Sequence, residues 1–596
     1  MNPNNQAEDS SQQNNTGNMY SYHDEDNINN NNTSNNQNQN NLQEAIRRSM
    51  NEINPYANSN NKNYPPDTYN YNYQNSENNI NNNVQILQNQ TYYNSLNNNK
   101  DKSFIQWVPY IIFAFIEIVI IILIGCLFEW DIRNDPKYST VNMILENEKK
   151  NETNETNNKS LDIYIGIKNA TDTEMREYDG LFRDINVMVF VGFGMFHTLL
   201  KRFSWTSITI NMMSIALSFQ IGLFTNLLWA NAFNEKWITG KLNFDSFIRS
   251  IINSASVLIS SGCVFGKLNI FQYIIMFILE TIMCSLNFQL CDVKLKAIDG
   301  GALYIHTFGA LFGISIYMVL FYSSKMKSKN LGEDRFNKSD YTSNLTSFIG
   351  VIFLWCYFPS FNSGLVTNIN ARHRSSINTY ISLIGSVLGA FSFSSLFFKG
   401  RILFEHILFG SFSGGVMISG CCSLCKDHWA ALLIGLLSGS ISVICLYFIK
   451  PYFIKWKYFD IYNIFYIHGL PGFLGAFITP MVIGNLKFRM GGEEYHFLLK
   501  DMERENNLQA GVQIGAIFIT IGLAFVSGIS TGYLMKVSTC GKIEKFFIDS
   551  EMFENRINVI DNVELNQFYY GNINRASLLQ NRLDFPSEGG SEPAYD

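Results

Sequence analysis

The sequence predicts an all-α polytopic membrane protein with about twelve transmembrane helices. From Ser103 onward the chain carries long apolar runs such as VPYIIFAFIEIVIIILIGCLF, and a membrane-spanning helix needs about 20 predominantly apolar residues. Most of these runs lack the charged faces that the helices of a soluble bundle present to water. Several are interrupted by Gly, Ser or Asn, which is typical of helices that pack closely in membranes. The candidate spans lie near 104–129, 185–203, 206–231, 247–265, 269–290, 302–323, 343–363, 376–397, 402–424, 428–450, 461–485 and 512–536.

The chain divides into three parts by composition. Residues 1–102 are dominated by Asn, Gln, Ser and Tyr, and such a segment buries too little apolar surface to offset its ordering entropy, so we expect a disordered tail. Residues 103–537 form the predicted transmembrane domain, with a long loop at 131–184, and residues 538–596 form a predicted C-terminal tail. In the N-terminal tail, LQEAIRRSMNEI at 42–53 resembles a ubiquitin-interacting helix without its acidic lead-in, and a membrane-surface or chance helix is the alternative.

Loop charge predicts the orientation of the chain. Alternate short loops such as LLKRFSW, FFKGRI and KPYFIKWK are basic, which indicates the cytoplasmic side and places both termini there. The loop at 131–184 is then extracellular, as its Asn-X-Thr/Ser triplets also indicate. We expect a multi-pass protein of the plasma membrane. The possible glycosylation acceptors are Asn151, Asn154, Asn158 and Asn169.

Two histidines occur in matching apolar settings, YIHTFGALFG with His306 and YIHGLPGFLG with His468. Each has an upstream aspartate, Asp299 or Asp460. Counted from the second span, the histidines fall in the fifth and the tenth span, which predicts two five-helix inverted repeats preceded by one extra span. Repeats of opposite topology bring equivalent residues together near the bilayer midplane. We therefore expect the two imidazoles to meet.

Two imidazoles in a low-dielectric interior are expected to be mainly neutral at pH 7, because burial disfavours the charged form. A neutral imidazole has one donor and one acceptor nitrogen, so a pair can share one hydrogen bond and still present polar edges to a small guest. An intact ammonium ion is costly to desolvate in a narrow apolar tube. The pair therefore suits a small cation that loses its proton before it crosses.

The remaining polar candidates are interpreted as structural. His197 and His406 lie within spans and are assigned to packing. Cys421, Cys422 and Cys425 could suggest a metal site, but the cluster lacks a second ligand pair at zinc spacing, and buried free cysteines pack as small hydrophobic residues. We expect no metal, no cofactor and no nucleic-acid partner. The sequence shows no nucleotide loop, metalloprotease helix or nucleophile elbow, so no enzyme is expected.

The motifs resemble the Rh branch of the Amt/Mep/Rh ammonia channel family over roughly 104–537. The segments that carry the resemblance are VMVFVGFGMFHTLLKRF, DGGALYIHTFGALFG, FLWCYFPSFNSG, HRSSINTYISL, HILFGSFSGGVM and HGLPGFLGA. The resemblance implies a homotrimer with one pore per subunit that conducts ammonia, with methylammonium as an analogue. Non-conducting scaffolds or sensors and carbon dioxide channels are the alternatives. A water channel would show two Asn-Pro-Ala boxes, which are absent from the sequence.

The resemblance also implies roles for individual residues. His306 and His468 correspond to the twin pore histidines, and Phe361 to the phenylalanine above them at the outer constriction, with Trp355 in the wall. Asp460 corresponds to an aspartate that orders the backbone before the second histidine.

Two features depart from the family pattern. Asp299 lies seven residues before His306 instead of eight, so it is either part of a different backbone turn or a simple helix N-cap. The second outer-gate phenylalanine has no counterpart, although Phe247 might substitute for it. We therefore expect a single-ring gate at Phe361.

Overall fold

The computed structural model describes the membrane-domain residues and little of the tails. The described residues are 103–130, 178–234, 237–322, 338–366, 368–456, 458, 460–490, 504–537, 547 and 549. The segment at 42–53, the four glycosylation acceptors and nearly all of both predicted tails lie outside them. The chain forms two units, Met1–Phe104 and Ile105–Asp596, and the fold described below is that of the second.

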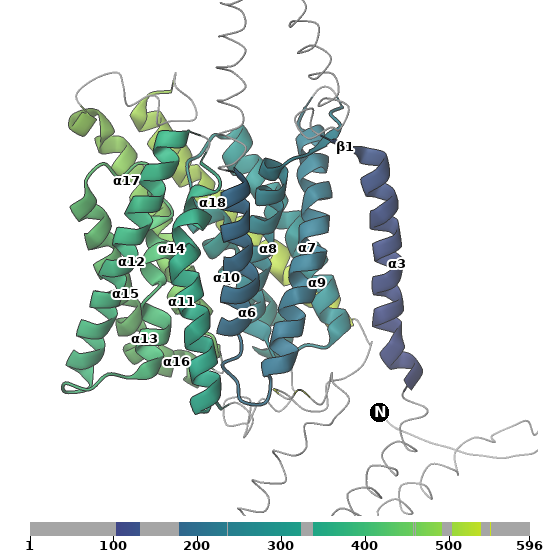
Figure 1. Cartoon of the computed structure of the whole chain (residues 1–596), viewed down its shortest axis with the longest axis horizontal. Coiled ribbons are helices and arrows are strands. Elements are labelled where there is room, and N and C mark those ends of the chain that lie inside the picture. Colours follow the sequence, from purple (N-terminus) through teal and green to yellow (C-terminus); the bar gives the residue numbers. More distant parts are fainter. Residues whose placement is uncertain are drawn as a thin grey trace, which may run out of the picture. The chain divides into compact units, whose positions relative to one another are not determined.

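Ten helices within the described ranges are long and apolar enough to cross a membrane. Figure 1 shows them running in roughly the same direction, most of them packed as a bundle and α3 standing apart at its right. In chain order these helices are α3 (Ser103–Leu127), α7 (Ser204–Ala232), α8 (Phe244–Val264), α9 (Ile270–Phe288) with the π-helix η2 (Gln289–Lys294), η3 (Ala302–Thr307) with α10 (Phe308–Tyr317) and η4 (Met318–Tyr322), α11 (Tyr341–Ser363), α12 (Ile369–Phe397), α15 (His428–Phe448) with α16 (Lys450–Lys455), η6 (Phe465–Gly469) with α17 (Leu470–Met490), and α18 (Asn506–Val537).

The predicted spans near 185–203 and 402–424 are not among these ten helices. The first is helical without interruption from residue 178 to Phe196, through η1 (Met188–Gly192) and α6 (Phe193–Phe196), and ends there, before the end of the predicted span. The second consists of α13 (Phe404–Gly410) and α14 (Ser413–Ile418), separated by a two-residue turn. The polytopic helical class is therefore correct, and ten of the twelve expected spans are helices long and apolar enough to cross a membrane among the described residues.

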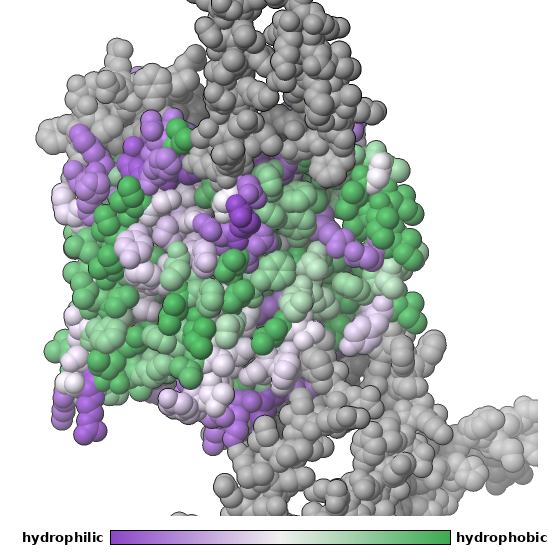
Figure 2. Space-filling model, in the orientation of Figure 1, coloured by the Kyte–Doolittle hydropathy of each residue, from purple (hydrophilic) through white to green (hydrophobic). Residues whose placement is uncertain are grey.

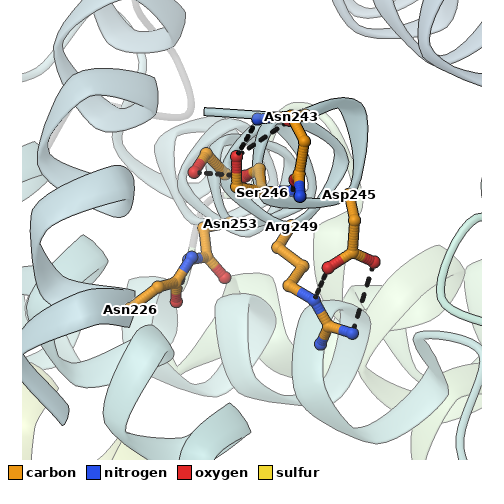
Figure 3. A network of polar contacts seen from close by, with 7 residues as sticks. Asn226, Asn243, Asp245, Ser246, Arg249 and Asn253 are labelled. Carbon is orange, nitrogen blue, oxygen red and sulfur yellow. Dashed lines mark hydrogen bonds and ion pairs between the residues drawn. The ribbon is translucent and has the colours of Figure 1, made fainter. Parts of the chain in front are cut away.

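Side-chain caps fix where several spans begin. The side chain of Asn243 accepts a hydrogen bond from the backbone N–H of Ser246, whose hydroxyl bonds back to the N–H of Asn243. This reciprocal capping satisfies donors that the first helical turn leaves unpaired. In Figure 3 Asp245 and Arg249, one helical turn apart, point towards each other, with Arg249 Nε donating to the carboxylate at 2.9 Å. Similar caps begin α9 and α11, and the strands β1 (Phe128–Trp130) and β2 (Gly240–Leu242) pair in parallel before α8.

Small residues allow the helices to approach closely. A Cβ on Gly435 of α15 would lie 1.8 Å from the carbonyl oxygen of Ser382 on α12, and one on Gly439 would lie 2.1 Å from that of Ser386. Contacts this short require glycine, so α12 and α15 pack backbone to backbone, as is common for helices in membranes.

Apolar side chains face outwards as well as inwards. Ile111 and Phe115 of α3 and Phe518 of α18 are among the large hydrophobic residues that are more than half exposed. Figure 2 shows hydrophobic residues over much of the middle of the visible face, with hydrophilic residues gathered mainly towards its two ends. An apolar surface of this kind suits contact with the hydrocarbon core of a bilayer, and exposing it to water would cost free energy.

Candidate functional site

His306 and His468 lie side by side in the middle of the bundle. Their Nδ1 atoms are 3.1 Å apart, and the rings stack with centroids 5.1 Å apart and planes 14° from parallel. Both side chains are completely buried. The two residues are 162 positions apart in the sequence, so the contact depends on the way the two parts of the chain fold together.

A π-helical turn positions His306. Asp299 accepts hydrogen bonds at Oδ2 from the backbone N–H groups of Leu303 and Tyr304, at 2.9 and 3.1 Å. Gly301 has φ = +125°, a conformation that residues with a Cβ rarely adopt, and its carbonyl accepts from the N–H of His306. Asp299 therefore caps the turn that carries His306. Gly301 provides the unusual backbone conformation found between this aspartate and the histidine seven residues later.

A matching π-helical turn positions His468. Asp460 accepts at Oδ2 from the N–H of Phe465 at 3.2 Å and from the hydroxyl of Tyr458 at 3.3 Å. In both halves, therefore, a buried aspartate bonds the first turn of the helix that carries the histidine. The segments around His306 and His468 therefore resemble each other both in the YIH motif and in the aspartate that caps the helix before it.

Glycines let these two helices cross at the histidines. A Cβ on Gly472 would lie 2.8 Å from the carbonyl oxygen of Ala302 and 3.1 Å from Cβ of His306. A Cβ on Gly469 would lie 3.2 Å from the side chain of Ala310. Since the helices meet at positions with little or no side chain, the two imidazoles can reach each other.

Two phenylalanine rings of α11 cover His306. The centroid of its imidazole lies 5.9 Å from that of Phe358 and 6.2 Å from that of Phe361, and both phenylalanines are buried. Trp355 packs instead against Tyr380 of α12 at 5.0 Å. Phe358 was not predicted from the sequence, although its position three residues before Phe361 on the same helix is a usable signal.

Phe247 belongs to a separate aromatic group. Its ring lies 5.7 Å from that of Phe182 and 5.2 Å from that of Phe219. These contacts put it against the helices that begin at residue 178 and at Ser204, and the structure places no ring contact between it and Phe361 among the described residues.

Aromatic rings also lie beyond His468. Phe193 stacks on its imidazole with centroids 6.2 Å apart, and Phe412 lies at 5.8 Å. A cavity of about 610 Å³ opens near this side, at the end of the bundle where α11 begins, and Phe409 and Tyr466 are in its lining. The imidazole pair is therefore enclosed by aromatic side chains on both sides.

The hydrogen-bonding chemistry of the pair follows from its geometry. One Nδ1 must donate to the other, so one ring has an acceptor at Nε2 and its partner has a donor there. Both Nε2 atoms are buried without a hydrogen-bond partner in the part of the chain that the structure describes. The pair thus offers one donor and one acceptor to a small guest.

Cys421, Cys422 and Cys425 are buried, with the Sγ atoms of the first and third 3.8 Å apart. Among the described residues no group of three or more His, Cys, Asp or Glu side chains could hold a metal ion.

Comparison with known proteins is consistent with this arrangement. Residues 168–555, more than half of the chain, match the Ammonium Transporter Family. Ammonium transporter Rh type B of Danio rerio is 31% identical over 456 residues, which are 74% of this chain and 90% of that protein. Ammonium transporter Rh type C of Bos taurus is 30% identical and covers 65% of this chain and 85% of its own length.

A solved structure is similar across the same region. Rh50 of Nitrosomonas europaea, from the Rhesus protein family of channels, superposes with a TM-score of 0.57 at 25% identity and covers 68% of this chain and 99% of its own. The chain therefore belongs to the ammonium transporter family, as a member of its Rh branch.

Proposed function

We propose that the protein conducts ammonia across a membrane, recruiting ammonium and passing mainly the neutral molecule between His306 and His468. The observation that carries this proposal is the stacked imidazole pair, with both Nε2 atoms buried and unpartnered among the described residues. Ammonia both donates and accepts hydrogen bonds, so it complements the donor and the acceptor of the pair.

The surroundings of the pair favour a neutral guest. Phe358, Phe361, Phe193 and Phe412 contact the imidazoles, and an apolar enclosure of this kind disfavours an unpaired charge strongly. An ammonium ion therefore crosses most readily after it loses its proton. Methylammonium, as a slightly larger amine, serves as the analogue.

The finer architecture belongs to the same proposal. The matching π-helical turns, each capped by a buried aspartate, support two inverted repeats that follow one extra span, with twelve spans in total. In that arrangement both termini are cytoplasmic and Phe361 lies on the outer side of the pair. A homotrimer with one pore per subunit, in the plasma membrane, completes the proposal.

A flux measurement tests the function. Proteoliposomes that contain the full chain are expected to alkalinise inside faster than empty vesicles when an inward ammonium gradient is imposed, because ammonia that enters binds a proton. A rate equal to that of empty vesicles would contradict conduction and favour a scaffold or sensor. Faster acidification under a carbon dioxide gradient alone would favour a gas channel for that molecule.

Variants of the pair test the site. His306→Ala and His468→Ala are each expected to lower the ammonia flux at least tenfold, since each removes one polar edge and leaves the other imidazole without its shared hydrogen bond. Light scattering of the detergent-solubilised protein checks that the oligomer is retained. Wild-type flux in both variants would mean that the pair is structural.

A further inference from the structure

A third imidazole lies close to the pair. His197 follows α6 and is completely buried. The ring of Phe193 lies between it and His468, at 5.8 Å from the first imidazole and 6.2 Å from the second. The two histidines are also close enough to interact electrostatically. His197 therefore continues the row of rings that begins at Phe361.

The hydrogen bonds around His197 determine which nitrogen carries the proton. Asn211 donates from Nδ2 to the carbonyl oxygen of Phe193 at 3.3 Å, which directs its Oδ1 towards His197. That oxygen lies 3.1 Å from Nδ1 of the imidazole. An amide oxygen only accepts, so Nδ1 of the neutral ring must donate to it. Nε2 is consequently an acceptor.

This acceptor is left unsatisfied by the described protein atoms around it. Nε2 of His197 is buried and makes no hydrogen bond with any described residue. The ring centroids of Phe265 and Tyr462 lie 4.7 and 4.9 Å from that of the imidazole, so its nearest neighbours are aromatic faces and edges. A buried polar atom without a partner costs about 1–3 kcal/mol, which suggests that a guest supplies the missing donor.

The position of His197 fits a step after the pair. Leu199 and Leu200, two and three residues after it, are in the lining of the 610 Å³ cavity. The hydroxyl of Tyr462 donates a hydrogen bond to the backbone carbonyl oxygen of His197. Ile461, the residue before Tyr462, also lines the cavity. The imidazole is thus linked through Phe193 to His468 and lies on a segment whose next residues line the cavity.

We propose that Nε2 of His197 is a third binding position for ammonia, occupied after the molecule leaves His468. The guest must be small, neutral and a hydrogen-bond donor, because the nitrogen accepts and its neighbours are aromatic. Ammonia and methylamine meet these conditions. This inference rests on the proposed conduction of ammonia and adds a site to it, at a histidine whose sequence context indicated only packing.

Three substitutions of His197 separate this role from a structural one. His197→Gln places an amide near the position of Nε2, whereas His197→Asn places one near the position of Nδ1, where it can still reach Asn211. His197→Leu removes both. If Nε2 binds the guest, the Gln variant retains a flux within about twofold of the wild type, and the Asn and Leu variants lose about fivefold, equivalent to about 1 kcal/mol.

The opposite pattern would overturn the proposal. If only the bond to Asn211 matters, the Asn variant retains its flux and the Gln variant loses it. Equal fluxes in all three variants and in the wild type would also contradict the third site, while ammonia conduction itself would stand. A wild type that does not conduct would instead sink the proposed function. His406→Gln, at a buried histidine that packs against Phe398, serves as the matched control and should leave the flux unchanged.

A structure of the wild-type chain in methylammonium provides a test that does not depend on the folding of variants. Methylamine contributes two heavy atoms, so it can be distinguished from water. We expect its nitrogen about 3 Å from Nε2 of His197. Density for the guest near the pair but absent at His197 would refute the third position.

Discussion

At the scale of single residues, α11 presents two rings to one histidine. Phe358 and Phe361 are three positions apart and therefore neighbours on the helix surface. Their centroids lie 6.0 Å apart with planes 75° from parallel, an edge-to-face contact that holds both rings in place. The cover over His306 is thus a pair of rings on one helix, and among the described residues Phe247 makes no ring contact with either of them.

This arrangement predicts how selectivity changes. Phe361→Leu is expected to raise the flux of methylammonium relative to ammonia about threefold, because an aromatic contact worth about 0.5–1.5 kcal/mol is lost and the passage widens. Phe358→Leu should change the ratio in the same direction. Parallel flux assays with the two amines measure it. Phe247→Leu, which alters a ring packed on Phe182 and Phe219, is the control and should leave the ratio unchanged.

At the scale of elements, the distance between the imidazoles is set by how closely η3 approaches α17. Gly472 provides this approach, since any Cβ there would contact both Ala302 and His306. Gly484 lies on the same helix, and a Cβ added to it would meet nothing within 4 Å. In α17, therefore, Gly472 lies where a side chain would disturb the site, whereas Gly484 lies where a methyl group has room.

We expect Gly472→Ala to lower the ammonia flux about tenfold or more and to reduce the melting temperature, because η3 must move away and separate the histidines. Gly484→Ala should leave the flux unchanged and keep or slightly raise the stability, as alanine favours a helix. Flux assays and thermal unfolding of both variants test this. Equal behaviour of the two would show that the helix crossing tolerates a methyl group.

The repeated YIH motif predicted that His306 and His468 would meet, and their Nδ1 atoms do lie 3.1 Å apart. Neither the π-helical turns nor the break between α13 and α14 in the span near 402–424 could be predicted from a repeated motif. Hydropathy reports whether a segment is apolar and does not report whether its backbone forms one continuous helix. His197 was assigned to packing because its partner Asn211 and the ring of Phe193 become neighbours only in the folded bundle.

At the scale of the whole molecule, buried charges link loops from the two halves. Lys267, after α8, donates to the carbonyl oxygen of Cys263 at 2.8 Å and lies 4.8 Å from the ring centroid of Tyr317. Asp460, before η6, interacts electrostatically with this lysine. Burial lowers the pKa of Lys267 to about 8, although the attraction of Asp460 opposes the shift. The same aspartate caps the turn that carries His468, so the link also supports the site.

The link makes stability depend on pH in a predictable direction. Burial raises the pKa of Asp460 from 3.8 to about 6, and Lys267 opposes the shift. The folded state therefore binds more protons between these two values. The stability that protonation of Asp460 contributes is fully present below pH 3.8 and is lost as the pH rises through 6.

Relative to Asp460→Asn, which does not titrate, the free energy of unfolding of the wild type should fall between pH 4 and 6, by up to about 1.4 kcal/mol per pH unit, and level off by pH 7. Unfolding of the two detergent-solubilised proteins across this range measures the difference. In a Lys267→Met background the fall should still begin near pH 4 but extend to higher pH, because loss of the lysine raises the pKa of Asp460 in the folded state and leaves that of the unfolded chain unchanged. A difference that stays constant from pH 4 to 7 in both backgrounds would mean that Asp460 has the same affinity for protons in the folded and unfolded chain.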